Sequence, residues 1–209
     1  DSMTAEVFLN VYADFTCPKL VTTPRTAEMI KYVSNSLLAT MISFSNEIGN
    51  MCSAVPGVDA RLVWKGVHLD RRLTPINGQV GGAAGVTEYL WHGLGFGGSC
   101  FPKDVAALRS FGRTVGEQTR MLDAVLDINA DQPLRMVALL EKELSLAGKT
   151  VAVLGLAFKP GTDDLRESPA LPLVAELRKK GAKVLVHDPI AMPHAKKRPE
   201  FRDVVFAED

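Results

Sequence analysis

The chain has 209 residues, of which 46% are apolar and 23% charged, an ordinary globular composition that excludes a largely disordered chain. Lysine plus arginine equals aspartate plus glutamate at 24 each, so no overall field favours nucleic acid or an anionic membrane, and we expect neither partner. No apolar run is long enough to span a bilayer, and the first ten residues lack a signal-peptide pattern. Three widely spaced cysteines favour a reducing compartment such as the cytoplasm, and the histidines make no metal-ligand spacing, so no metal site is expected.

The first elements in chain order are a short helix and a short strand. Phe8, Val11, Tyr12 and Phe15 fall on one helical face, and 19–23 ("KLVTT") has a strand pattern. A helix and a strand with no partner strands before them are typical of the end of a larger unit. We therefore expect the chain to begin inside a longer protein.

A long helix follows. Thr23 and Pro24 provide an N-cap and a proline for the first helical position. No breaker follows before Pro56, which predicts about thirty residues of helix, or roughly 45 Å. One face carries an apolar stripe, and because few globular helices are this long, we expect another part of the chain or a second subunit to cover it. The apolar stripe consists of Ile30, Val33, Leu37, Met41, Phe44, Ile48, Met51 and Val55.

The middle of the chain reads as further helices. They are predicted at 59–69, from Pro102 onward, at 116–129 and at 134–144, with Pro133 opening the last of them. A glycine-rich segment, 74–86, lies between the first two and is predicted to be a mobile loop.

From Gly148 the pattern changes to strand, loop, helix and strand. Strands are predicted at 150–154 and 183–187, a helix from Ser168 to Lys180 between them, and a candidate third strand at 204–206. This is the opening βαβ unit of a parallel sheet, which usually has five or six strands, so we expect the C-terminal end also to be cut. The predicted fold class is α/β overall, with an all-α middle domain around a long helix, followed by the first half of a Rossmann-like parallel α/β domain.

The segment "GLGFGGSCFPKD", 93–104, carries the clearest chemical signal. Gly93, Gly95 and Gly98 fit the G-x-G-x-x-G nucleotide-binding spacing, but no clear strand pattern precedes them, so that interpretation is the weaker one. The glycines more plausibly let the backbone approach a bound substrate.

Cys100 lies just before the helix that begins near Pro102. The positive end of this helix and the charge of Lys103 both favour a thiolate, the form that a nucleophile needs, and Asp104 in the same turn could act on a water or proton. A free cysteine is often only a small core residue, which is our interpretation of the other two. On the long helix, Lys31 and Asn35 share a face and could stabilise an oxyanion, although exposed helix residues of these types are usually solvated.

Three motifs together resemble the nucleotide-sugar 6-dehydrogenases, and most closely the UDP-glucose 6-dehydrogenases. They are "EMIKYVSNSLLATMISFSNEIGN", "GFGGSCFPKD" and "VLGLAFKPGTDDLRESPA", in the family's order. The resemblance implies that 1–24 end an N-terminal NAD-binding Rossmann domain. It implies a helical middle domain at 25–146 that forms a homodimer through the long helix, and part of a C-terminal domain for the sugar nucleotide at 147–209.

The resemblance also implies a reaction. The substrate would be a UDP-sugar, namely UDP-glucose, and NAD-dependent oxidation by four electrons would give UDP-glucuronate. The reaction would pass through a thiohemiacetal and a thioester on Cys100. Lys31 and Asn35 would stabilise the oxyanions, and Asp104 would orient or activate water.

Binding roles are implied at further positions. Lys103 and Arg166 match groups that meet NAD, and Arg72 matches an arginine that reaches the substrate of the other subunit. The glycine-rich segment makes the link after Arg72 longer than is usual in the family. Asp188 ends the second predicted strand, where a classical dinucleotide-binding fold holds the ribose of NAD. The resemblance implies a structural role for Asp188 instead. Substrate contacts are implied for Tyr89, Leu90, Gly97, Phe158 and Lys159.

Alternatives remain open at this point. GDP-mannose 6-dehydrogenase is the nearest rival within the family, and the phenylalanine after Cys100 leans toward UDP-glucose. The chain by itself could be an inactive helical dimerisation module. A thiol hydrolase that pairs Cys100 with His92 has less support, because no orienting carboxylate lies beside His92 in the sequence.

Overall fold

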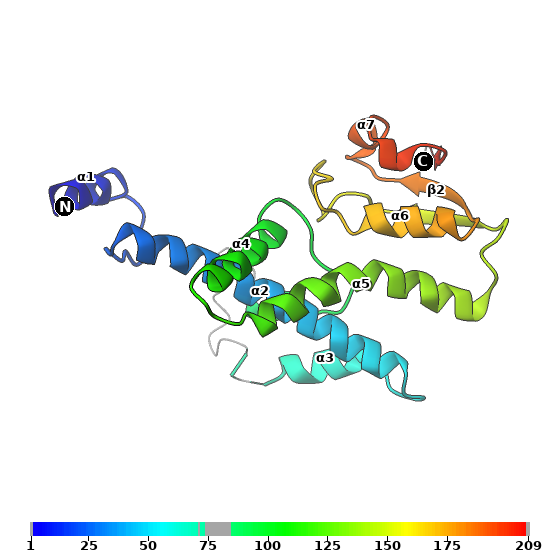
Figure 1. Cartoon of the computed structure of the whole chain (residues 1–209), viewed down its shortest axis with the longest axis horizontal. Helices are drawn as coiled ribbons and strands as arrows, with labels where there is room; N and C mark the ends of the chain where they lie inside the picture. The colour runs from blue at the N-terminus through cyan, green and yellow to red at the C-terminus, as the bar shows by residue number, and fades with distance from the viewer. Residues whose placement is uncertain (1, 71, 74–84, 208–209) are drawn as a thin grey trace.

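The computed structural model describes residues 2–70, 72–73 and 85–207, which form a helical part followed by a small α/β part (Figure 1). In the helical part, α2 crosses α4 and α5, while α1 lies apart from the other helices. The elements are α1 (Ser2–Val11), α2 (Pro24–Ser53), α3 (Ala60–His68), the 3-10 helix η1 (Val86–Tyr89), α4 (Phe101–Thr114), α5 (Arg120–Glu143), β1 (Thr150–Leu154), α6 (Ala170–Lys179), β2 (Lys183–His187), α7 (Met192–Ala195), η2 (Pro199–Phe201) and β3 (Val205–Phe206).

The predicted start of the long helix is confirmed. The Thr23 hydroxyl accepts a hydrogen bond from the Thr26 amide at 3.3 Å, and Pro24 occupies the first turn of α2. The cap satisfies one of the amide groups that have no partner within the helix, so this start is encoded locally.

α2 turns a face of small and polar residues toward the rest of the chain, not the apolar stripe. Small side chains let the helices approach closely. Most of the stripe is exposed, as in Leu37 at 59% and Met51 at 61%. Of the two expected partners for the stripe, another part of the chain is therefore excluded among the described residues, and a second subunit stays a prediction. The buried residues of α2 are Ser36, Ala39, Ser43, Ser45, Asn46, Gly49 and Cys52.

Two other local predictions are wrong. Residues 19–23 form no strand, because no strand of the described chain lies beside them to pair with, and Leu20 is 77% exposed. The two helices predicted at 116–129 and 134–144 are one helix, α5, which continues through Pro133. A proline inside a helix removes one hydrogen bond, but Pro133 is fully buried, and the burial of its ring offsets that loss.

The α/β part confirms the predicted βαβ unit. Its three strands are parallel in the order β1-β2-β3, with Thr150 opposite Lys183 and Leu185 opposite Val205. α6 begins one residue after Pro169, and the Ser168 hydroxyl accepts a hydrogen bond from the Ala170 amide at 3.2 Å.

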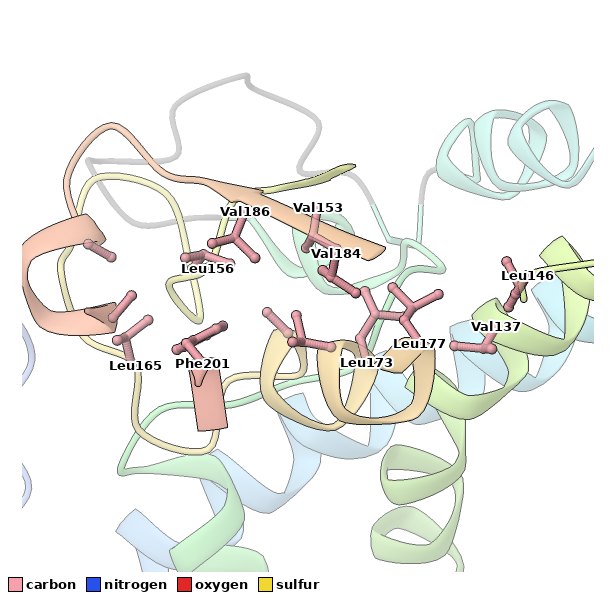
Figure 2. Packing of buried hydrophobic residues seen from close by; sticks show 14 residues of the cluster. Val137, Leu146, Val153, Leu156, Leu165, Leu173, Leu177, Val184, Val186 and Phe201 are labelled. Carbon is pink, nitrogen blue, oxygen red and sulfur yellow. The ribbon is translucent and has the colours of Figure 1, made fainter. Parts of the chain in front are cut away.

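The main core lies between α6 and the sheet, where Leu173 and Leu177 face Val184 and Val186 (Figure 2). Val137 of α5 extends this core into the helical part, so the two parts are packed together. A second, smaller core lies where α2, α4 and α5 meet Phe96, in the segment 93–99 just before Cys100. It consists of Ala39, Phe96, Val105 and Val125.

Candidate active site

The Cys100 motif lies at the start of α4. Cys100 is the N-cap residue of that helix, its carbonyl accepts the Asp104 amide at 2.8 Å, and its free thiol is exposed. The sulfur lies 3.9 Å from the Ser99 hydroxyl. The predicted position of this thiol at the positive end of a helix is therefore confirmed.

Asp104 gathers three donors around one buried carboxylate. Its Oδ2 accepts hydrogen bonds from Asn35 Nδ2 at 2.5 Å and Lys31 Nζ at 3.2 Å, and its Oδ1 accepts one from Lys103 Nζ at 2.6 Å. Asp104 is only 2% exposed. The fold thus joins Lys31 and Asn35 of α2 to the first turn of α4. The sequence predicted that Lys31 and Asn35 share a helix face, but not that this face meets Asp104.

The electrostatics of this cluster favour a charged Asp104. Burial raises the pKa of its carboxyl, but the three donors outweigh burial and hold the pKa below its ordinary value. The pKa of Lys103 is raised, mainly by its hydrogen bond to Asp104 and also by the charge of that carboxylate. Asp104 therefore orients Lys31 and Asn35 as a fixed anion, and its expected action on water stays a prediction.

The glycines before Cys100 let the C-terminal part of the chain approach. A side chain at Gly97 would collide with the Glu167 carbonyl, and one at Gly98 would meet the Phe158 ring at 2.8 Å. The Gly98 amide donates to the Arg166 carbonyl at 2.8 Å. At these two positions the approaching group seen in the structure is the chain itself, where the sequence had suggested a substrate.

A cavity of about 520 Å³ opens beside the thiol segment, a size common for ligand sites. Lys103 and Arg166, the two residues expected to meet NAD, both line it, and so does Arg198, which sequence reasoning missed. The hydrogen bond with Asp164 and the charge of that carboxylate raise the pKa of Arg166. Three cationic side chains fit the phosphate groups of a dinucleotide. The lining residues are Gly98, Ser99, Pro102, Lys103, Arg166, Glu167 and Arg198.

Three of the expected substrate residues lie near the thiol segment. The Phe158 ring lies against Gly98, with Lys159 Nζ 5.4 Å from its centre. The Tyr89 ring lies 6.2 Å from the ring of Phe101, the residue after Cys100.

The structure does not bring the remaining predicted residues to this cluster. Leu90 is buried, and its carbonyl lies 3.0 Å from His68 Nε2. Arg72 is exposed and pairs with Asp70. His92 packs against Gly49 of α2, with a buried Nδ1. No described contact joins His92 to Cys100, which speaks against the thiol hydrolase.

Asp188 has the structural role that was expected. Both of its oxygens accept backbone amides, from Leu156 at 2.7 Å and Ala157 at 3.1 Å on one side, and from Ile190 at 2.9 Å and Ala191 at 2.7 Å on the other. Burial raises the pKa of its carboxyl, but these four bonds outweigh burial and lower it.

The glycine-rich segment lies almost entirely outside the described residues. In the described part of the chain, no helix has the length and apolar character needed to cross a bilayer.

Comparisons with known proteins agree with this arrangement. Residues 25–131 match the central domain of the UDP-glucose/GDP-mannose dehydrogenase family, and 152–209 match the UDP binding domain of that family. A UDP-glucose 6-dehydrogenase of Haloferax volcanii is 46% identical over 182 residues, which is 87% of this chain and 39% of that protein. UDP-glucose 6-dehydrogenase TuaD of Bacillus subtilis is 41% identical over 192 residues, or 91% of this chain and 39% of that protein.

A solved structure supports the same relationship. The chain superposes on a UDP-glucose dehydrogenase from Pyrobaculum islandicum with a TM-score of 0.89 and 43% identity, over 100% of this chain and 45% of that one. The chain therefore spans about two fifths of the length of the curated relatives that it matches. Because a family domain matches half of the sequence and the fold agrees over its whole length, the chain belongs to the UDP-glucose/GDP-mannose dehydrogenase family.

Proposed function

We propose that this chain provides the nucleophile and the oxyanion donors of an NAD-dependent nucleotide-sugar 6-dehydrogenase that converts UDP-glucose to UDP-glucuronate. The observation that carries the proposal is the exposed Cys100 thiol at the start of α4, in the same turn as the carboxylate that holds Lys31 and Asn35. UDP-glucose is favoured over GDP-mannose because the most similar relatives described above are named UDP-glucose 6-dehydrogenases.

The chemistry follows from the thiol. In the first oxidation the primary alcohol carbon loses a hydride and its hydroxyl loses a proton, which gives an aldehyde. The Cys100 thiolate adds to the aldehyde carbon, and the oxygen of the resulting thiohemiacetal takes up a proton. Loss of that proton and of a second hydride gives a thioester, and attack by water on its carbonyl carbon breaks the C–S bond and releases the carboxylate, the thiolate and two protons. NAD, when bound, supplies the acceptor for each hydride.

Lys31 and Asn35 would donate N–H groups to the oxyanions of these steps. Each has donors beyond the one it gives to Asp104, since an ammonium carries three N–H groups and an amide two. Removing one such donor typically costs roughly a hundredfold or more in kcat. Asp104 would keep both donors in place and orient or activate the attacking water.

Binding would be divided between the two parts of the chain. Lys103 and Arg166, with Arg198 beside them, would hold the phosphate groups of NAD in the cavity next to the thiol segment.

The domains would be the end of an NAD domain at 1–24, a middle domain at 25–146 and a sugar-nucleotide domain at 147–209. The free cysteines favour a cytoplasmic location. Substrate contacts would come from Tyr89, Leu90, Gly97, Phe158 and Lys159, and from Arg72 across a dimer.

We further propose that the apolar stripe of α2 forms a homodimer interface. Its residues Ile30, Leu37, Phe44 and Met51 are each at least 48% exposed and recur on one helical face. Such a face is usually covered by a partner. The exposed stripe is also the observation that favours a dimerisation module as the role of the chain by itself, a function compatible with the first.

The test is the stoichiometry of the reaction in the full-length protein. With UDP-glucose, the wild type should produce two NADH per sugar, while Cys100→Ser should stop after the first oxidation and yield one or fewer. Cys17→Ser, which changes another exposed thiol, should still give two. Two NADH per sugar from Cys100→Ser would refute the covalent route, and faster turnover of GDP-mannose would refute the substrate.

A further inference from the structure

We propose that Asn129 of α5 is a positioning residue that fixes the segment before Cys100 and thereby the place of the thiol. The inference rests on the proposed function for its kinetic part. It concerns a residue outside the thiol, the oxyanion donors and the cavity described above.

The Asn129 side chain makes two hydrogen bonds to a single residue of that segment. The Phe96 amide donates to Asn129 Oδ1 at 2.7 Å, and Asn129 Nδ2 donates to the Phe96 carbonyl at 3.0 Å. Two bonds, one to each of the peptide groups that flank Phe96, fix both the position and the orientation of the backbone at this residue, which a single bond cannot do. An irregular segment has no ladder or helix partners of its own, so its backbone groups need partners elsewhere, and at Phe96 the Asn129 side chain provides both of them.

The residue before Phe96 is shaped to admit this amide. Gly95 has a φ of +105°, a conformation that L side chains rarely adopt. A Cβ at this position would lie 2.5 Å from Asn129 Oδ1. The backbone of the segment and the Asn129 side chain therefore fit each other only when residue 95 is glycine.

Phe96 carries this constraint to Cys100. Its side chain is 5% exposed and lies in the small core with Val105 of α4. Its ring also meets the ring of Phe101 edge to face, with centroids 6.1 Å apart. Phe101 directly follows Cys100, so Phe96 and the first turn of α4 hold the thiol segment from both ends.

Helices α2 and α5 share a matched pair of amide side chains that does not touch the segment before Cys100. Asn50 Nδ2 donates to Gln132 Oε1 at 3.0 Å, and Gln132 Nε2 donates to Asn50 Oδ1 at 3.4 Å, which joins α2 to α5. Gln132 lies one turn beyond Asn129 on α5. Gln132→Ala therefore removes a pair of amide bonds of the same kind from the same helix and serves as the control.

The first experiment compares Asn129→Ala with Gln132→Ala in the full-length protein. We expect kcat with UDP-glucose to fall about tenfold to a hundredfold in Asn129→Ala, because a displacement of about 1 Å at reacting groups can cost a hundredfold. The KM for UDP-glucose should change less than about threefold, and both variants should lose similar thermal stability. Unchanged kcat in Asn129→Ala, or an equal fall in Gln132→Ala, would overturn the proposal.

A double-mutant cycle tests the contact between Asn129 and the segment. Gly95→Ala should lower kcat more in the wild type than in the Asn129→Ala background, because the second change removes the oxygen that the new methyl group meets. The unfavourable φ of residue 95 is present in both backgrounds and cancels. Additive effects would contradict the contact.

A measurement without substrate separates this proposal from the proposed function. Iodoacetamide alkylates exposed thiolates, and Cys17 is a second exposed cysteine in the same molecule that serves as an internal reference. The ratio of the Cys100 rate to the Cys17 rate, read by mass spectrometry, should fall at least about threefold in Asn129→Ala, because the thiol leaves its place at the helix end. Gln132→Ala should keep the wild-type ratio. If the wild type failed to oxidise UDP-glucose, only the proposed function would be refuted, and an unchanged ratio would refute the role of Asn129.

Discussion

Replacing the buried carboxylate of Asp104 by an amide is the most direct test of the cluster at the start of α4. Asp104→Asn keeps the size and shape of the side chain but removes its charge. The carboxylate accepts three hydrogen bonds, from Asn35, Lys31 and Lys103. A hydrogen bond to a charged group contributes about 1.5–3 kcal/mol and a neutral one about 0.5–1.5 kcal/mol, so the bonds from Asn35 and Lys31 to the amide oxygen would each weaken by about 1 kcal/mol. The bond from Lys103 would be lost, because the amide nitrogen that replaces Oδ1 cannot accept it.

Solvent reduces this sum. The side chains of Lys31 and Lys103 are 60% and 64% exposed, so their share of the interaction is screened. We therefore expect Asp104→Asn to lower the free energy of unfolding by about 2 kcal/mol, which for a chain of this size lowers Tm by roughly 4–8 °C. Asp123→Asn is the control, because the Asp123 side chain is 35% exposed and pairs with Arg113 near the surface. Loss of the Asp123 charge should lower the free energy of unfolding by less than about 1 kcal/mol.

The pH dependence adds an independent check. The pKa of Asp104 in the folded chain lies below its ordinary value of 3.8, so its charge stabilises the fold fully above pH 3.8. This stabilisation is lost as the pH falls through the lower, folded pKa. The gap between the wild type and Asp104→Asn in urea unfolding should therefore be constant from pH 7 to about pH 5 and shrink below pH 3.8. A gap of zero at pH 7, or one that stays unchanged at low pH, would refute the reasoning.

Three further substitutions test the Asp188 carboxylate, the close approach at Gly97 and the apolar stripe of α2. Asp188→Asn should lower the free energy of unfolding by about 2–4 kcal/mol in urea titrations, because one amide oxygen cannot accept four backbone amides, while Asp163→Asn on the surface should change it little. Gly97→Ala should cost about 1–3 kcal/mol and lower kcat, because its methyl group collides with the facing carbonyl, while Gly93→Ala meets no atom within 4 Å and should be silent in both assays. Leu37→Asp should turn a dimer into a monomer in sedimentation at micromolar concentration, and a monomeric wild type would contradict the dimer.

Much of the fold was predictable because its signals are local. The hydroxyl of Thr23 and the ring of Pro24 set the start of α2 from within one turn, and the alternation of 183–187 sets β2 in the same way. Pro133 shows the limit of such signals, since local chemistry favours a helix boundary there and only the buried surroundings of the residue decide otherwise.

The candidate site likewise has one part that local sequence signals determine and another that only the tertiary structure determines. The sequence by itself determined that Cys100 stands at a helix start beside Lys103 and Asp104, because neighbours along the chain remain neighbours in the first turn of a helix. Only the tertiary structure decided that Asp104 meets Asn35, which lies 69 positions away, and that Asn129 holds Phe96 across 33 positions. Periodicity shows which residues share a face but not what that face meets. Contacts between distant segments depend on how whole helices pack, and the small residues that direct the packing of α2 carry no apolar signal in the sequence.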